Sequence, residues 1–475
     1  MPPYLALLVW LILVVALFWF DPAKEPQISM ALWVPLTWIG LMASREPSQW
    51  LDGNNWMAGG ALIAESFQEG NPLNRTISLL LLLLGIGILL SRSFRWGNFF
   101  SRNRVLTVYL VFALISVLWS DFPFAAFRKW SRDLTAYVMI FVCLSESQPI
   151  VAVGVLLRRL GYLLLPLSIV LIKYFPILAR QYDPFTGAVT YCGATTSKNM
   201  LGELCLICGI FFFWDSVVRW PNHKRRRDRR IILVNVVMVG MVVWLLVTCN
   251  SATSQTCLII GCLLILAAHT KAVQRRPAIL TVTVPVAFLL YALLFFGMGM
   301  STQFAAIVGR TSLSGRTDIW QIVLGQHTNA LVGTGYESFW LGPRLQRIWA
   351  SGMGELNEAH NGYLEAYLNL GYTGLALLLL LVAATYGDIC RLFRPFSSIV
   401  SFTLAIWTAF LFHNCTEADF RSGLMWFSFL LAAVPVAMLR QEGRGASALG
   451  RNVRRTDRFQ TSLCDTGQAI QPAHR

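Results

Sequence analysis

The sequence predicts an all-α integral membrane protein with about 12–13 transmembrane helices and one large loop on its outer face. Three observations indicate this fold class. The 475-residue chain is 56% hydrophobic, and only 13% of its residues are charged, about half the roughly 25% of an ordinary soluble domain. Apolar runs of about 20 residues, the length that crosses a bilayer, recur along the chain. A soluble globular protein, a disordered chain and a disulfide-stapled secreted module all fit this composition poorly.

The predicted spans begin close to the N-terminus. They are 4–20, 28–44, 76–91, 105–120, 134–150, 160–176, 200–218, 231–249, 255–270, 278–299, 370–387, 397–413 and 423–439. Only helices are expected, because backbone groups in hydrocarbon must form hydrogen bonds within their own segment. The first run has no basic region before it and no small-residue cleavage site, so we expect it to remain as a span.

Basic residues predict the orientation of the spans. The chain has 39 Lys and Arg against 24 Asp and Glu, a net charge of +15. The densest basic run is Arg219–Arg230, and the positive-inside rule places it and the loops that alternate with it in the cytoplasm. The net charge therefore indicates topology, and we expect no nucleic-acid partner. Two long polar segments, 45–75 and 300–369, fall on the opposite side.

The spans divide the chain into three predicted parts. Residues 1–118 form N-terminal transmembrane helices, residues 119–439 form a membrane core with the loop 300–369, and residues 440–475 form a basic, disordered cytoplasmic tail. Such a long loop is well above the usual connection length and is expected to be functional. Within it, Arg316–His327 has amphipathic helical spacing, which predicts a helix lying on the membrane surface.

Cysteine spacing predicts no metal site. Most of the ten cysteines lie inside apolar runs, where Cys behaves as a small buried hydrophobe. Cys205 and Cys208 form a CxxC pair on one apolar helix face, but no second pair accompanies it. A zinc site needs such a second pair of ligands.

The strongest chemical motif is GELNEAHNGYLEAYLNLGYTG, residues 354–374. His360 and Asn361 stand at the end of the exterior loop, and a histidine there can act as acid or base near neutral pH. Gly371 and Gly374 follow at the start of a span. A structural alternative is that His360 caps a helix and the two glycines allow close packing.

A second motif is SLSGRTDIW, residues 312–320. Arg316 follows Gly315 at the start of the amphipathic helix, where a guanidinium beside free helix N–H groups suits a diphosphate. The alternative is a local ion pair with Asp318 or a solvated arginine.

Two further groups place cations on the outer face. Lys198 and Asn199 follow a Gly/Thr/Ser turn at the mouth of the span 200–218, where a lysine opposes the helix dipole unless an anion binds. It can also simply extend toward the interface. Arg128, Lys129 and Arg132 lie in WSDFPFAAFRKWSR, against the positive-inside bias. An anionic lipid headgroup would explain them, as would an amphipathic segment on the membrane surface.

The turn HNCTEADFR, residues 413–421, crowds four ionisable groups at the end of a span. They are His413, Glu417, Asp419 and Arg421. Ionisable groups at such a position are costly unless they are paired or functional. The structural alternative is an internal pair between Asp419 and Arg421.

The order of these motifs resembles the O-antigen ligase / Wzy-type polysaccharide polymerase family. The resemblance rests on SGRxxxW, then GTGYESF, then HN followed after nine residues by GxxG, all within 312–374. The elements SKNxxG at 197–202 and WSxxP at 119–123 are similar to the exopolysaccharide polymerase branch. In all, the resemblance covers roughly 119–420.

The resemblance implies a glycosyltransferase in the bacterial inner membrane with its active face in the periplasm. Family members move a glycan from undecaprenyl diphosphate to an acceptor hydroxyl, without a metal or another cofactor. The acceptor is a lipid A core sugar in ligases and another lipid-linked repeat in polymerases. Expected partners are the lipid-linked oligosaccharide, membrane lipid, a flippase and a chain-length regulator. Family ligases carry an Arg before the large loop, where this chain has Asn250–Ser254 without one, which favours a polymerase.

The resemblance places the family histidine on His360 and the loop arginine on Arg316. Arg316 would stabilise the leaving diphosphate, with Lys198 and Arg128 as supports. His360 would act on the acceptor hydroxyl, and Glu417 is the second candidate base.

Three further residues complete the predicted site. Asn199 and Asn361 are predicted to bind substrate, and Tyr336 is expected to stack on a sugar ring together with Phe339 and Trp340. The alternative for these aromatic residues is an interfacial belt.

Three other functions remain open from the sequence. An O-antigen ligase and a protein O-oligosaccharyltransferase share the same motifs. A transporter or flippase would suit the many spans, although paired segments broken at matching places in two halves are not evident.

Overall fold

The computed structural model describes residues 1–19, 28–51, 71–92, 94, 96–182, 187–294, 316–352, 356–393 and 398–437. Within these ranges the chain is almost entirely helical, and the predicted all-α membrane fold is confirmed. The strands described are β1 (Arg180–Tyr182) and β2 (Val189–Tyr191), which pair antiparallel with Gln181 opposite Thr190. The tail 440–475 and most of the segment 45–75 lie outside the described residues, as do residues 300–315 of the loop.

Within the part of the chain that the structure describes, five helices are long and apolar enough to cross a membrane. They are α5 (Pro72–Leu90), α9 (Pro149–Tyr174), α11 (Lys198–Arg219), α12 (Arg226–Cys249) and α19 (Gly362–Leu392). A sixth candidate combines α6 (Trp96–Arg102) with α7 (Arg104–Ile115) and the 3-10 helix η3 (Ser116–Trp119), across a bend of 91°. The protein is therefore a multi-pass membrane protein.

Shorter apolar helices lie over the other predicted spans. They are α1 (Pro3–Trp19), η1 (Met30–Leu32) with α2 (Trp33–Met42), α13 (Ala252–Ala268), α15 (Ala278–Ala292), α20 (Ser398–His413) and the helix Leu424–Ala437. Each predicted span thus coincides with a helix. The count of about 12–13 crossings stays a prediction, as do the three predicted parts of the chain.

One pair of predicted boundaries is wrong. The spans 134–150 and 160–176 correspond to α8 (Pro123–Leu144) and α9, which begins at Pro149. Each helix has proline in its first turn, a position where the missing N–H costs nothing. Arg128, Lys129 and Arg132 consequently belong to the first half of a 22-residue helix.

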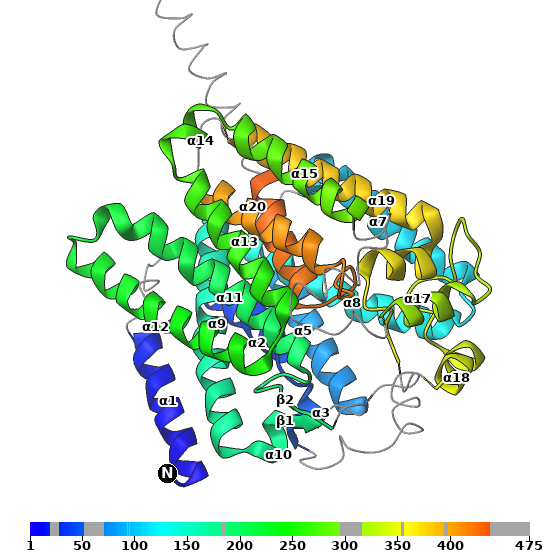
Figure 1. Cartoon of the computed structure of the whole chain (residues 1–475), viewed down its shortest axis with the longest axis horizontal. Helices are drawn as coiled ribbons and strands as arrows, with labels where there is room; N and C mark the ends of the chain where they lie inside the picture. The colour runs from blue at the N-terminus through cyan, green and yellow to red at the C-terminus, as the bar shows by residue number, and fades with distance from the viewer. Residues whose placement is uncertain are drawn as a thin grey trace, which may run out of the picture.

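The large loop folds against itself. The predicted amphipathic helix is confirmed as α17 (Arg316–Leu324), and α18 (Gly342–Ala350) follows. Buried side chains of α17, α18, the segments beside them and α19 form a small apolar core of Ile319, Val323, Phe339, Trp340, Leu345, Ile348, Ala359 and Leu368. In Figure 1 both helices lie at one edge of the molecule, opposite α1 and α12.

A break in α19 fixes the loop to the membrane helices. Gly371 has φ 65° and ψ −168° inside this helix. The N–H groups of Tyr372 and Thr373 just after the break bond to the carbonyls of Ala330 and Leu331. A Cβ on Gly371 would lie 2.3 Å from the Leu331 carbonyl carbon, so only glycine fits. The predicted close approach at Gly371 is confirmed, and it holds residues 330–335 against the helix that carries the His360 segment.

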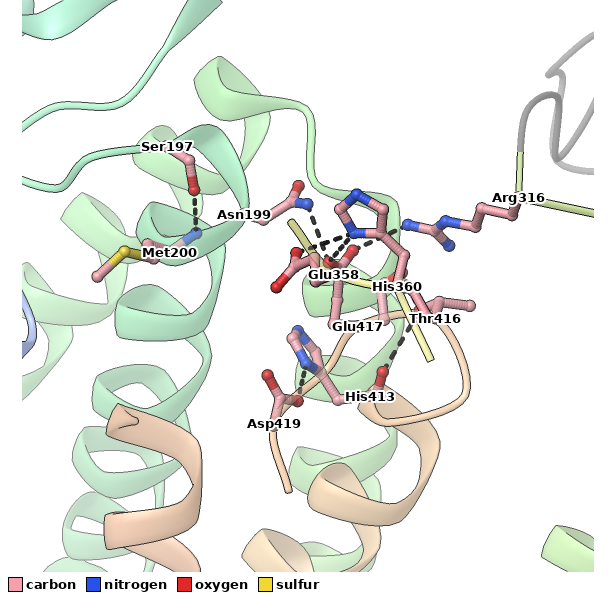
Figure 2. A network of polar contacts seen from close by, with 12 residues as sticks. Ser197, Asn199, Met200, Arg316, Glu358, His360, His413, Thr416, Glu417 and Asp419 are labelled. Atoms are coloured by element: carbon pink, nitrogen blue, oxygen red, sulfur yellow. Dashed lines mark hydrogen bonds and ion pairs between the residues drawn. The ribbon is translucent and has the colours of Figure 1, made fainter. Parts of the chain in front are cut away.

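Other elements described are α3 (Pro47–Leu51), α10 (Pro176–Ala179), η4 (Trp220–Asn222) and α14 (Lys271–Arg275). In the centre of the bundle, α11 packs against α9, α12, α13 and α20. Near one end of α11 and one end of α20, Asn199 and Glu417 lie beside His360 of the loop, where the candidate site lies (Figure 2).

Candidate active site

Five charged side chains from three separate segments meet at this end of the bundle. They are Arg316, Glu358, His360, Glu417 and Arg421. Arg316 opens α17, Glu358 and His360 precede α19, and the other two follow α20. We call these five residues the charged cluster. Figure 2 shows the side chains of Arg316 and His360 pointing toward the Glu417 carboxylate.

Glu417 lies at the centre of the contacts. Its Oε1 is 2.9 Å from Arg316 Nη2, and its Oε2 accepts a hydrogen bond of 3.0 Å from the Asn199 amide. His360 Nδ1 is 3.4 Å from the same Oε2. The carboxylate is buried, so its interactions are screened less than those of a surface pair.

Glu358 forms the second half of the cluster. Its Oε1 lies 3.0 Å from His360 Nδ1, and its Oε2 accepts a hydrogen bond from Arg421. His360 Nδ1 is therefore shared between two carboxylates. It does not align with either as a directed hydrogen bond, so we describe both contacts as ion pairs. Counted as charges, the cluster holds two arginines and one imidazole against two carboxylates.

The surroundings keep this cluster charged at neutral pH. Burial opposes the imidazolium form, but the contacts with Glu358 and Glu417 outweigh it and raise the pKa of His360 to about 9. Burial also opposes ionisation of Glu358, but Arg421 and His360 outweigh it and lower its pKa to about 2. His360 is thus a cation and a hydrogen-bond donor across the neutral range.

The local backbone explains how His360 reaches the cluster. His360 has φ 48°, a left-handed conformation that a non-glycine residue rarely adopts and that often marks a functional position. Asn361 then caps α19, since its side chain accepts from the N–H groups of Tyr363 and Leu364. The alternative in which His360 caps the helix is therefore wrong. The Asn361 side chain is the cap, and its contact with substrate stays a prediction.

At the start of α11, Ser197 plays the corresponding role. Its side chain accepts from the Met200 N–H, and this cap directs Asn199 toward Glu417 (Figure 2). Lys198, the first residue of α11, is half-buried beside this contact. It forms no ion pair with any residue that the structure describes. The structure therefore brings Asn199 to Glu417 of the cluster, and the role of Lys198 stays a prediction.

Arg128 on α8 and Tyr336 in the loop make separate contacts, and neither contact is with the charged cluster. The Arg128 guanidinium lies 5.0 Å from the centre of the Phe124 ring. The Tyr336 hydroxyl donates to the buried Asp133 carboxylate at 2.8 Å. The hydroxyl of Tyr336 is engaged inside the protein, and the stacking of its ring on a sugar stays a prediction.

The two other aromatic predictions are wrong. Phe339 and Trp340 are buried in the apolar core of the loop. The Trp340 indole donates to Glu365 at 2.7 Å. Neither side chain forms an interfacial belt or a free stacking platform, because both fill the space between α17, α18 and α19.

Two local ion pairs considered from the sequence are replaced by contacts across the fold. Arg316 pairs with Glu417 and not with its neighbour Asp318. Asp419 contacts His413 Nδ1 at 2.5 Å, while Arg421 contacts Glu358. In both cases the longer-range partner brings separate segments together.

Sequence reasoning missed the importance of Glu358 and Arg421. Glu358 stands two residues before His360 in the same motif, and Arg421 stands four residues after Glu417. Their closeness in the sequence to His360 and Glu417 could have pointed to them. Their contact with each other could not be predicted from the sequence, because it depends on the packing of the loop against the turn 413–421.

The cluster also has a donor set that resembles a cation site. One ligand atom each from Glu358, His360 and Glu417 lies within 4.8 Å of the others. However, Arg316 and Arg421 already oppose the two carboxylates. We therefore assign the three side chains to an ion-pair network with arginine.

Comparisons with known proteins agree with the motifs. Residues 244–379 match the model of the O-antigen ligase family, a range that includes Arg316 and His360. The exopolysaccharide production protein ExoQ of Rhizobium meliloti (strain 1021) is 27% identical over 308 residues, which cover 62% of this chain and 67% of that protein. These matches support a polysaccharide-related ligase or polymerase role. The predicted resemblance is confirmed, because residues 244–379 of this membrane protein match the O-antigen ligase model.

Proposed function

We propose that the protein polymerises glycan repeat units from undecaprenyl-diphosphate-linked donors at the periplasmic face of the bacterial inner membrane. The observation that carries the proposal is the charged cluster, in which Arg316 and His360 face one buried carboxylate, Glu417. It combines cations for a leaving diphosphate with a carboxylate for a hydroxyl proton. Exopolysaccharide production by the ExoQ relative favours polymer synthesis.

The first requirement is a place for the charge of the leaving group. When the bond between the anomeric carbon and the diphosphate oxygen breaks, its electron pair stays on the diphosphate. Arg316 and the His360 imidazolium are already positioned near each other by Glu417, so little reorganisation is needed to stabilise that charge. Lys198, at the adjacent N-terminus of α11, would support the same anion.

The second requirement is an acceptor for the proton of the attacking hydroxyl. The acceptor oxygen forms the new bond to the anomeric carbon, and its proton moves to a carboxylate. Glu417 is the better candidate, because its partners Arg316 and His360 are the groups that would turn to the diphosphate. Glu358 stays paired with Arg421, which keeps its pKa low and makes it a weak base.

This assignment changes the role that the resemblance gives to His360. An imidazole whose pKa is about 9 is already protonated at neutral pH and cannot accept a proton. We therefore propose that His360 acts as a cationic donor to the diphosphate. Because two arginines and this imidazolium supply the positive charge, we propose that the reaction needs no metal, and a chelator is expected to leave the rate unchanged.

The direct test uses the purified chain in detergent with a diphosphate-lipid-linked oligosaccharide. The wild type is expected to extend the saccharide by whole repeats, and Arg316→Ala and Glu417→Gln are expected to lose most of that activity. Arg347→Ala is a matched control, because Arg347 is an exposed arginine of the same loop on α18. Equal rates in wild type and Arg316→Ala would refute the proposal.

The products separate the related functions. Transfer of a single glycan to lipid A core would identify a ligase, and transfer to a protein would identify a protein O-oligosaccharyltransferase. Movement of intact lipid-linked saccharide across vesicles without a new glycosidic bond would identify a flippase. The absence of arginine from Asn250–Ser254 supports polymerase over ligase.

Orientation and partners are part of the proposal and have their own test. A topology reporter fused after residue 440 is expected to report a cytoplasmic location. That location would leave the charged cluster on the periplasmic side. Crosslinking in the native membrane is expected to recover a flippase and a chain-length regulator. A periplasmic reading at residue 440 would overturn the proposed active face.

A further inference from the structure

The turn that carries Glu417 is held by a buried chain of polar side chains. His413 is the last residue of α20 and is 2% exposed. Its Nδ1 lies 2.5 Å from Asp419 Oδ2, and its Nε2 lies 3.2 Å from Ser254 Oγ on α13. Ser254 is fully buried and also accepts a hydrogen bond from Ser251. Figure 2 shows His413 and Asp419 close together beneath the Glu417 carboxylate.

These hydrogen-bonded side chains follow the order serine, histidine and aspartate. Their location excludes a role for Ser254 as a nucleophile. Ser254 and His413 have almost no exposed surface, so a lipid-linked sugar cannot reach the Ser254 hydroxyl. A buried polar chain of this kind stabilises one conformation of the segments that it joins. The question is which conformation it holds and what depends on it.

The segments that it joins surround Glu417. His413 and Asp419 lie on either side of Glu417 in the chain, so their contact closes a seven-residue turn. Within the turn, the N–H of Glu417 bonds to the His413 carbonyl at 2.9 Å. The Thr416 hydroxyl is 2.9 Å from the hydroxyl of Thr253 on α13. The backbone of Glu417 is thus fixed from both sides.

Asn414 connects the same turn to the His360 segment. Its side chain accepts from the Asp419 N–H at 3.0 Å, and its carbonyl accepts from the Gly362 N–H at 2.9 Å. A Cβ on Gly362 would lie 2.0 Å from Asn414 Oδ1, so the two segments touch. Any change in the turn is therefore transmitted to the residues next to His360.

We propose that Ser254, His413 and Asp419 form a positioning unit that holds Glu417 opposite Arg316 and His360. The unit does not contact substrate, and it acts through Glu417. This inference rests on the proposed function of Glu417. The positioning unit requires no metal, ligand or oxidant, because it consists of side chains of this protein.

The test compares variants of His413 in the purified, full-length protein with the lipid-linked oligosaccharide as substrate. His413→Phe removes both contacts, and we expect kcat to fall roughly 100-fold, as a shift of about 1 Å in a reacting group can produce, while KM changes little. His413→Asn keeps a donor near the place of Nδ1 and is expected to recover most of kcat. Ser254→Ala removes the contact with His413 Nε2 together with the hydrogen bond from Ser251, keeps the His413–Asp419 contact, and is expected to lower kcat a few-fold.

A pH profile separates positioning from a general loss of stability. The groups that face His360 are Glu358 on its own segment and Glu417 on the turn, with Arg421 and Arg316 behind them. When Glu417 moves away, His360 loses one of its two carboxylates. The alkaline limb of the activity in Ser254→Ala and His413→Phe is therefore expected to shift to lower pH.

Thr408→Val is the matched control. Thr408 is buried in α20 and its hydroxyl bonds only to Leu404 of the same helix among the described residues, so the variant disturbs α20 without reaching Glu417. Thr408→Val is expected to keep the wild-type kcat and the wild-type alkaline limb of the pH–activity profile.

Two results would overturn the inference. One is that His413→Phe keeps both the wild-type kcat and the wild-type alkaline limb of the pH–activity profile. The other is an equal loss in His413→Phe and Thr408→Val that follows the amount of folded protein. Full activity of Glu417→Gln would instead overturn the proposed function.

Discussion

Two arginine–carboxylate networks in this protein differ in what holds them. The first surrounds Asp215 in α11, which contacts Arg158 of α9 at 3.1 Å, Arg219 at 3.0 Å and the Asn235 amide of α12 at 2.8 Å. The second is the charged cluster of Arg316, Glu358, His360, Glu417 and Arg421. All the side chains of the first come from helices, whereas those of the second come from helix ends and loops.

The charge balance of the two networks differs in the same way. Around Asp215 the arginines Arg158 and Arg219 are matched by Asp215 and Asp228. The charged cluster has three cations against two carboxylates once His360 is protonated. The first network joins three helices, and its two arginines are balanced by two carboxylates. The second holds an excess positive charge at the end of the bundle, which is the arrangement that an anionic substrate needs.

The largest expected effect is on the helix network. Asp215→Ala leaves Arg158 buried without its carboxylate, and breaking a buried pair in this way costs about 3–5 kcal/mol. Thermal unfolding in detergent is expected to show the loss, while activity per folded molecule stays near wild type. A normally folded Asp215→Ala protein without activity would contradict the division between the two networks.

The opposite result is expected for Arg316→Ala. Removal of one preorganised donor to a developing anion costs roughly 10²–10³ in kcat, and the half-buried position of Arg316 predicts little change in unfolding temperature. Arg316→Lys keeps the charge but not the planar fork of donors, so it is expected to recover only part of the rate. A large loss of stability in Arg316→Ala would show that the charged cluster, like the network around Asp215, serves to stabilise the fold.

The pH dependence of the rate sharpens the comparison. The pKa of His360 is raised from 6.5 to about 9, so its ion pairs contribute fully below pH 6.5 and are lost as the pH rises through 9. If the imidazolium binds diphosphate, the rate is expected to fall along the same limb, and His360→Gln is expected to abolish the limb. A rate that rises through pH 9 would show instead that His360 is the base.

The smallest expected effect concerns Asn361. Because its side chain caps α19, Asn361→Ala is expected to cost about 1 kcal/mol of stability. Asn361→Ser keeps a capping oxygen and is expected to recover both stability and activity. If Asn361→Ser unfolds like wild type but binds substrate poorly, Asn361 is a substrate ligand after all.

Much of the helix arrangement follows from the sequence because hydropathy is a local property. Each predicted span coincides with a helix, and the fold brings Arg316 and His360, which the family motifs single out, to one carboxylate. The boundary near residue 145 was predicted less well, although Pro149 was a visible signal for a new helix. Apolar runs on either side of a short break cannot be separated by hydropathy alone.

The partners of the charged residues did not follow from the sequence. Arg316 bonds to a residue 101 positions away, and the contact between Arg421 and Glu358 spans 63 positions. Such pairs depend on the break at Gly371 and on the turn 413–421, which together bring the loop to the bundle. The aromatic residues show the same limit, because Phe339 and Trp340 fill a core that only the folded loop creates.

The central claim is that the charged cluster transfers glycan from a lipid diphosphate. The most direct measurement is product length when the purified protein is incubated with a diphosphate-lipid-linked oligosaccharide. We expect the wild type and Arg347→Ala to form chains of several repeats, and Arg316→Ala and Glu417→Gln to form them at least about 100-fold more slowly. Chains formed by Arg316→Ala and Glu417→Gln at the wild-type rate would contradict the claim.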